Sequence, residues 1–206
     1  MSKVVVLPNG FELTEELMRD FLTQAFAHGY GVADSVPGLL PGSKSFAPFV
    51  LNVGDASLRY QDQYHGRRNS AGVSQVDYLE KDKFVKPLML IIYRGLVNPK
   101  ATDGELAAAL DTLKKTLRVK SGRARLPLVG ESLLGNIFYT TSETDYAYNG
   151  YTSGDIWDLR YVEVVRRKHR INPIKEDDPE YWFGRLLDGR WEGAVIVHRF
   201  EHILLA

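Results

Sequence analysis

The sequence of 206 residues contains no cysteine. This absence excludes a disulfide scaffold, a thiolate metal site and a cysteine nucleophile. It fits a reducing compartment, so we expect a cytoplasmic protein. Long apolar runs are missing as well. The apolar stretch before Pro8 is too short for the core of a signal peptide, and no stretch reaches the length of a membrane span. We therefore expect no association with a membrane.

An excess of charge of one sign is also missing. Lysine plus arginine and aspartate plus glutamate each number 26, so the formal net charge is zero. We do not expect nucleic acid as a partner, because no global field attracts phosphates. Two basic stretches, Lys114 to Arg125 and Arg166 to Arg170, could bind phosphate groups. Alternatively, the first caps the negative end of a helix and the second pairs with acids at 176–180.

Recognisable reaction motifs are the third absence. The sequence has no G-x-G-x-x-G, no P-loop, no G-x-S-x-G and no H-E-x-x-H. No motif therefore specifies a reaction, a cofactor or a metal, and no residue can be assigned a catalytic role. What remains is the pattern of apolar and polar residues, which bears on the fold and on the positions where a site could lie.

That pattern predicts two helices. One runs from Thr14 to Ala27, with Thr14 as N-cap and an apolar face at helical spacing. Gly29 is expected to end it in the left-handed conformation. The second runs over 103–119 and begins at a capping box, in which Thr102 and Glu105 exchange hydrogen bonds.

Strands are predicted after each helix. Residues 58–64 alternate, so that Leu58, Tyr60, Asp62 and Tyr64 share one face. A hairpin is expected from 73–79 and 84–93, and the apolar run Pro87 to Tyr93 indicates a strand buried on both faces. Further strands are predicted at 49–53, 137–141, 146–148, 156–167 and 194–205, the last of them central. Asp188-Gly189 has the composition of a hairpin turn.

The order of elements is helix, strands, helix, strands. It predicts an α+β fold with one compact domain over 1–206. We interpret it as two degenerate helix-plus-antiparallel-sheet halves, near 12–98 and 102–206, that arose by internal duplication.

A set of short motifs carries a family resemblance. They are Gly54-Asp55, Tyr60-Gln-Asp62-Gln-Tyr64-His-Gly66, Ala71-Gly72 and Tyr93-Arg-Gly95-Leu-Val97, with fainter echoes at Tyr148-Asn-Gly150 and Leu159-Arg-Tyr161-Val-Glu163. The chain resembles a bacterial family of domains of unknown function with Y-x-D-x-Y-x-G and F-x-G-x-E repeats, some of them fused to a repressor-type helix-turn-helix. The resemblance implies an α+β fold, a bacterial or phage origin and a ligand-sensing role.

The sequence departs from that pattern at several places. Ser74 stands where the first F-x-G-x-E has its acid, and Ala71 stands where it has its aromatic residue. His202 and Ile203 replace the closing glycines, and residues 168–185 form an insertion. In the second half, Glu163 keeps an acid at the corresponding position.

Five residues are the candidate ligand-binding site: Tyr60, Asp62, Tyr64, His65 and Glu163. Tyrosine hydroxyls and a carboxylate on one face of a concave sheet could orient a small molecule or a nucleotide. A buried Glu163 would need a partner or a raised pKa, which marks functional sites. The alternative is an ordinary sheet face, with tyrosine rings buried and Glu163 in water.

His198 and His202 are the remaining candidates for chemistry. On a helix they would share a face and could bind zinc, but a strand holds them too far apart for one ion. We therefore predict no metal site.

Three functions follow from these residues. The first is a small-ligand-binding or sensing module without catalytic activity. The second is a regulator or inhibitor that binds a bacterial or phage enzyme. The third is a hydrolase-like enzyme, in which Asp62 or Glu163 acts as general acid or base and His65 assists.

Overall fold

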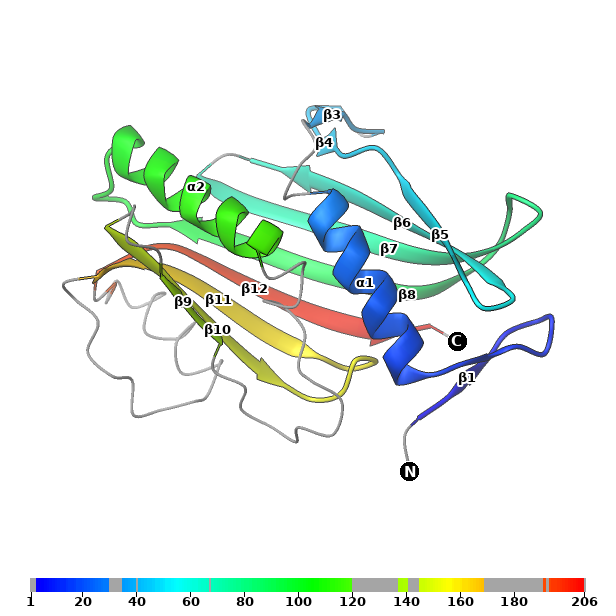
Figure 1. Cartoon of the computed structure of the whole chain (residues 1–206). Helices are drawn as coiled ribbons and strands as arrows, with labels where there is room; N and C mark the ends of the chain where they lie inside the picture. The colour runs from blue at the N-terminus through cyan, green and yellow to red at the C-terminus, as the bar shows by residue number, and fades with distance from the viewer. Residues whose placement is uncertain are drawn as a thin grey trace.

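A computed structural model describes residues 3–29, 35–39, 41–66, 68–119, 137–140, 145–168, 191 and 193–205. Its architecture is α+β, a large antiparallel sheet with two helices on one of its faces (Figure 1). The predicted turn at Asp188-Gly189 and the acids at 176–180 lie outside the described residues, as does most of the basic segment after Val119.

The two helices are α1, Glu15–His28, and α2, Asp103–Val119. Both N-termini confirm the predicted caps. The Thr14 side chain accepts a hydrogen bond from the Leu17 amide at 3.3 Å, and Thr102 and Glu105 form the capping box. Helix α1 ends at Gly29 as predicted, but the left-handed conformation predicted there is wrong. Gly29 has a φ of −71°, and its amide donates a hydrogen bond to the Ala25 carbonyl oxygen at 2.9 Å.

The large sheet contains ten of the described strands. The first block consists of β3 (Val36–Pro37), β4 (Lys44–Ser45), β5 (Phe49–Val53), β6 (Ala56–His65), β7 (Asn69–Glu80) and β8 (Lys83–Val97). The second consists of β9 (Ile137–Thr140), β10 (Tyr146–Ser153), β11 (Arg160–Arg167) and β12 (Ala194–Leu204). Strands β1 (Val5–Val6) and β2 (Glu12–Leu13) form a separate hairpin before α1.

The strand order across the sheet is β3-β4-β6-β7-β8-β12-β11-β10-β9, and β5 also pairs with β6. Each helix is therefore followed by a block of strands, and the last strands of the two blocks, β8 and β12, pair antiparallel at the centre. This confirms the prediction that the final strand is central. The predicted hairpin is also confirmed, with its turn at Lys81 and Asp82, both at positive φ.

The main core lies between the sheet and the helices. Helix α1 lies over β5 and β6, and α2 lies over β10, β11 and β12 (Figure 1). The buried side chains of β6 are those of alternate residues, Ala56, Leu58, Tyr60 and Asp62. The predicted shared face is therefore correct, and it is the face beneath the helices.

Two strand predictions are wrong. Strand β8 is not buried on both faces, because the helices cover one face only and Ile92 on the other face is 49% exposed. Strand β11 begins at Arg160 rather than at residue 156. Asp155 accepts hydrogen bonds from the amides of Trp157 and Asp158 at 2.8 and 3.3 Å, which form a turn and delay the strand.

No helix among the described residues has the length and apolar composition needed to cross a membrane.

Candidate functional site

A cavity of about 290 Å³ lies between the helices and the sheet. Its floor comes from β6, β7, β8 and β12, and its walls come from the end of α1, from β4 and its flanking residues, and from α2. The lining includes Phe46, Tyr60, Asp62, Tyr64, Tyr93 and His198. The cavity combines aromatic walls with a few polar groups, as small-molecule sites do.

Asp62 anchors one polar cluster on this floor. The residue is 7% exposed, and Oδ1 accepts hydrogen bonds from the hydroxyls of Ser74 and Tyr93, both at 2.8 Å. The Tyr60 hydroxyl donates to Ser74 Oγ at 2.7 Å. Ser74 lies directly opposite Asp62 in the β6–β7 register, which explains their contact. The cluster compensates a nearly buried carboxylate with hydroxyl donors.

Gly72 allows Tyr93 to join this cluster. Tyr93 lies on β8, and β7 separates it from Asp62 on β6. A Cβ on Gly72 would lie 2.4 Å from the Tyr93 hydroxyl and 2.5 Å from the Gln63 carbonyl oxygen. Only a residue without a side chain leaves space for the tyrosine to cross β7.

Glu163 anchors a second polar pair. Its side chain is 1% exposed, and Oε1 lies 2.6 Å from His198 Nδ1. The Tyr148 hydroxyl donates to Oε2 at 3.2 Å. Glu163 and His198 face each other in the β11–β12 register. In the neutral tautomer that donates Nδ1–H to this carboxylate, the other ring nitrogen, Nε2, is an acceptor.

A second glycine lies beside His198. Gly95 is opposite both His198 and Ser70 in the register. A Cβ on Gly95 would lie 2.7 Å from His198 Nε2 and 2.3 Å from Ser70 Oγ. The histidine nitrogen and the serine hydroxyl therefore lie on either side of the missing side chain, within reach of one bridging water.

Three cationic side chains line the same cavity: Lys44 of β4, Arg68 before β7 and Lys114 of α2. Arg68 is held by the Asp103 carboxylate at 2.8 Å and the Ala101 carbonyl at 3.0 Å. Among the described residues that line the cavity, Asp62 is the single acidic one. Lys44 and Lys114 are exposed whereas Asp62 is nearly buried, so the positive charge lies toward the solvent-facing rim of the cavity and the compensated carboxylate lies on its floor.

The structure brings together most of the residues predicted as a site. Tyr60, Asp62 and Tyr64 line the cavity. Glu163 is buried behind His198 and does not line the cavity. It contacts His198, whose imidazole does line it. His65 does not line the cavity and lies at the exposed end of β6.

Sequence reasoning missed Ser74, Tyr93, Gly95 and His198 as parts of this site. His198 was considered only as a zinc ligand. The pairing of the last two predicted strands could have revealed this contact, because a central β12 beside β11 places His198 next to Glu163. Ser74 was noted only as a departure from an acidic position, and here its hydroxyl serves the acid of the neighbouring strand.

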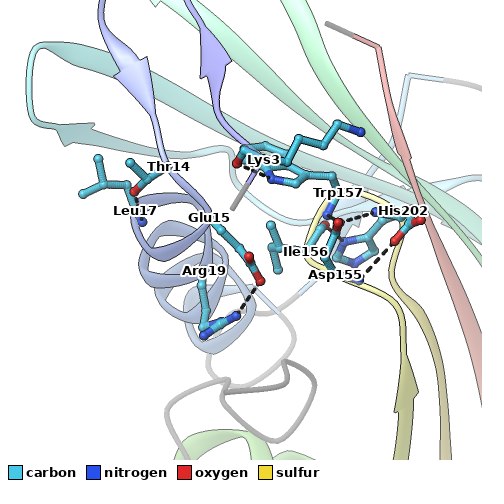
Figure 2. A network of polar contacts seen from close by, with 10 residues as sticks. Lys3, Thr14, Glu15, Leu17, Arg19, Asp155, Ile156, Trp157 and His202 are labelled. Carbon is cyan, nitrogen blue, oxygen red and sulfur yellow. Dashed lines mark hydrogen bonds and ion pairs between the residues drawn. The ribbon is translucent and has the colours of Figure 1, made fainter. Parts of the chain in front are cut away.

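His202, the other histidine of β12, lies away from the cavity. Figure 2 shows it beside the loop Asp155–Trp157, with Nδ1 2.8 Å from the Ile156 carbonyl oxygen. Burial lowers the pKa of His202 to about 4, although the Ile156 carbonyl favours the charged form. The same loop is fixed by the Trp157 indole, which donates to the Lys3 carbonyl at 3.2 Å. Among the described residues, no group of three His, Asp or Glu side chains could hold a metal ion.

The opposite face of the sheet holds a buried carboxylate that the sequence did not reveal. Asp77 on β7 is 0% exposed. Arg59 donates to it from Nε and Nη2 at 3.1 and 2.8 Å. The side-chain amides of Gln61 and Gln75 donate as well. All the donors lie on the same strand or the neighbouring one, so this cluster fixes the β6–β7 register.

Comparison with known proteins finds no relative. No family model matches the chain, and neither a curated protein nor a solved structure is similar to it at a significant level. The resemblance seen in the sequence motifs therefore stays a hypothesis.

Proposed function

We propose that the chain is a binding module for a small organic ligand, held in the cavity between the two helices and the sheet. The cavity itself carries the proposal. Its volume of about 290 Å³ is in the range of a small metabolite. Its polar lining comes from separate strands and is held in place by hydrogen bonds to buried partners, so the site is formed before a ligand arrives.

The aromatic lining supports the same function. Phe46 and Tyr64 stack with ring centroids 5.8 Å apart, and Phe26 meets Tyr60 edge to face at 5.8 Å. All four line the cavity. Rigid rings offer a large contact area for a planar ligand at low entropic cost.

A thermal-shift screen of metabolites and nucleotides tests this function. Leu110 of α2 is half-buried and lines the cavity, so Leu110→Phe adds volume there. Ala107→Phe places the same ring on the exposed side of the same helix. We expect at least one compound to raise the melting temperature of the wild type and of Ala107→Phe, and to lose this effect in Leu110→Phe. A screen without hits, or hits insensitive to Leu110→Phe, would contradict the proposal.

A second function is favoured by one specific observation, the Glu163–His198 pair. We infer that the pair acts as a general base in a hydrolase. His198 Nε2 would take the proton of an attacking water, whose oxygen bonds to the carbonyl carbon of an ester. The proton would then pass to the alcohol oxygen as its bond to that carbon breaks. Ser70 is near enough to position the water.

Hydrolysis of 4-nitrophenyl esters tests this second function. We expect His198→Gln to lower the rate by about a hundredfold, in line with the contribution of a general base. His65→Gln removes an exposed histidine outside the cavity and should leave the rate unchanged. Equal rates for the wild type and His198→Gln would exclude the pair as a base in ester hydrolysis.

The topology also supports an origin by duplication. Each helix is followed by a block of strands whose order along the chain proceeds from one edge of the sheet to its centre. The two blocks meet at β8 and β12. A crystal structure would test it by superposition of residues 12–98 on 102–206. We expect the helices and the last four strands of each block to superpose in the same order.

A further inference from the structure

Some polar groups of the cavity are held by other residues, as Arg68 is by Asp103 and His198 by Glu163, and two further sets remain, of which the second indicates the ligand. The first set, Tyr60, Asp62, Ser74 and Tyr93, is linked by hydrogen bonds among its own members. In the second set, Lys44 and Lys114 form no ion pair and the Ser70 hydroxyl forms no hydrogen bond within the part of the chain that the structure describes. These groups are available to a ligand.

Lys114 is directed to the cavity by the geometry of its helix. It follows Leu106 and Leu110 at intervals of four residues, and all three line the cavity. The adjacent Lys115 differs, since it pairs with Asp111 at 3.1 Å and does not line the cavity. The position on the helix therefore separates a lysine available to the cavity from one engaged on the helix surface.

Lys44 approaches the cavity from the opposite wall. It lies on β4 opposite Tyr64 in the register. Tyr64 in turn stacks on Phe46. An ammonium group beside an aromatic stack can bind the charged end of a ligand whose ring lies against Phe46 and Tyr64.

The negative charge of the site is placed away from this rim. Asp62 lies on the floor, where two hydroxyls donate to it. Glu163 is shielded by His198. A ligand would therefore meet two ammonium groups at the entrance and hydroxyl or imidazole groups at the floor. This arrangement favours negative charge at the outer end of the ligand and hydroxyl groups at its inner end.

We propose that the ligand is a small organic anion, in which a carboxylate or phosphate group binds Lys44 and Lys114 and a ring packs on Phe46 and Tyr64. This inference rests on the proposed binding function and adds the chemical class of the ligand.

Matched pairs of probes test the class. Each pair has one anion and its neutral counterpart: 4-hydroxybenzoate and 4-hydroxybenzamide, phenyl phosphate and phenol, uridine 5′-monophosphate and uridine. Isothermal titration calorimetry gives both affinities. We expect the anion of at least one pair to bind about tenfold more tightly than the neutral compound, which corresponds to about 1.4 kcal/mol. Added sodium chloride should weaken the anion alone, because salt screens exposed charges.

Two double variants complete the design. Lys44→Gln/Lys114→Gln should abolish the preference for the anion. Lys83→Gln/Lys115→Gln removes the same charge outside the cavity and should keep the preference. A neutral compound that binds as tightly as its anion would overturn the inference and leave the binding function intact. Failure of all three anions to bind at millimolar concentration would also overturn it, and the metabolite screen would then decide the binding function separately.

Discussion

The Tyr93 hydroxyl donates a hydrogen bond to Asp62 Oδ1 at 2.8 Å, although a whole strand separates the two residues. The contact passes over Gly72, whose missing side chain gives the ring its path. The Asp62 cluster therefore depends on a residue that contributes no polar atom of its own.

Gly72→Ala should destabilise the protein. The new methyl group would overlap the Tyr93 ring and the Gln63 carbonyl oxygen, so that the ring or the strand must move. We expect a loss of about 1–3 kcal/mol in the free energy of unfolding, the usual cost of overpacking. Urea denaturation measures it. Ala71→Thr adds atoms to the exposed face of the same strand and should change stability little. An unchanged Gly72→Ala variant would refute the steric argument.

Glu163 and His198 should be energetically coupled. The Glu163 carboxylate is almost completely buried, so loss of His198 removes its shortest polar contact, and the Tyr148 hydroxyl compensates it only in part. A double-mutant cycle with Glu163→Gln and His198→Asn should give a coupling energy of about 1–3 kcal/mol in urea denaturation. A coupling near zero would show that the two side chains do not depend on each other.

His202 should make stability fall in acid. Its pKa is lowered to about 4 in the folded protein from 6.5 in the unfolded chain. Above pH 6.5 both states are neutral at this residue. Between pH 6.5 and 4 the unfolded chain takes up the proton first, so the free energy of unfolding decreases, by about 3 kcal/mol in total.

His202→Asn provides the comparison for this effect. The asparagine amide can keep the hydrogen bond to Ile156 but cannot take up a proton in this range. We expect a flatter dependence of stability on pH in urea titrations from pH 7.5 to 4. Parallel curves of unfolding free energy against pH for the two proteins would mean that another group causes the loss of stability in acid.

Asp77 should be the most sensitive carboxylate on the outer face. Asp77→Ala leaves Arg59, Gln61 and Gln75 without their shared acceptor. We expect a loss of about 1–3 kcal/mol, because the two glutamine amides lose an acceptor while Arg59, at 29% exposure, can be solvated by water. Asp77→Asn retains an acceptor oxygen and should cost less. Equal effects of the two substitutions would argue against the network.

Both helices were predictable because their signals are local. Thr14 and the capping box of Thr102 and Glu105 involve contacts over three residues, which a sequence displays directly. The alternation of residues 58–64 also showed which side chains of β6 share a face. Each of these depends on neighbours along the chain rather than on the fold.

The site was predictable only in part, because its contacts are long-range. Asp62 stood out as an acid between tyrosines, but its partner Tyr93 lies 31 residues further along the chain. Likewise Glu163 was recognised as an acid in an apolar strand, whereas His198 became its neighbour only through the β11–β12 pairing. The exposed side of β8 was mispredicted for the same reason, since an apolar run does not show which face the helices cover.

The central pairing of β8 with β12 has a consequence for how the molecule forms during synthesis. Residues 83–97 must wait for residues 194–204 to leave the ribosome before the middle of the sheet can close. Until then the edge of β8 that faces away from β7 has no permanent partner, and an unpaired edge can pair with strands of other chains. We therefore expect the joining of the two blocks to be the last step of folding, and to be slow because it closes a loop of about one hundred residues.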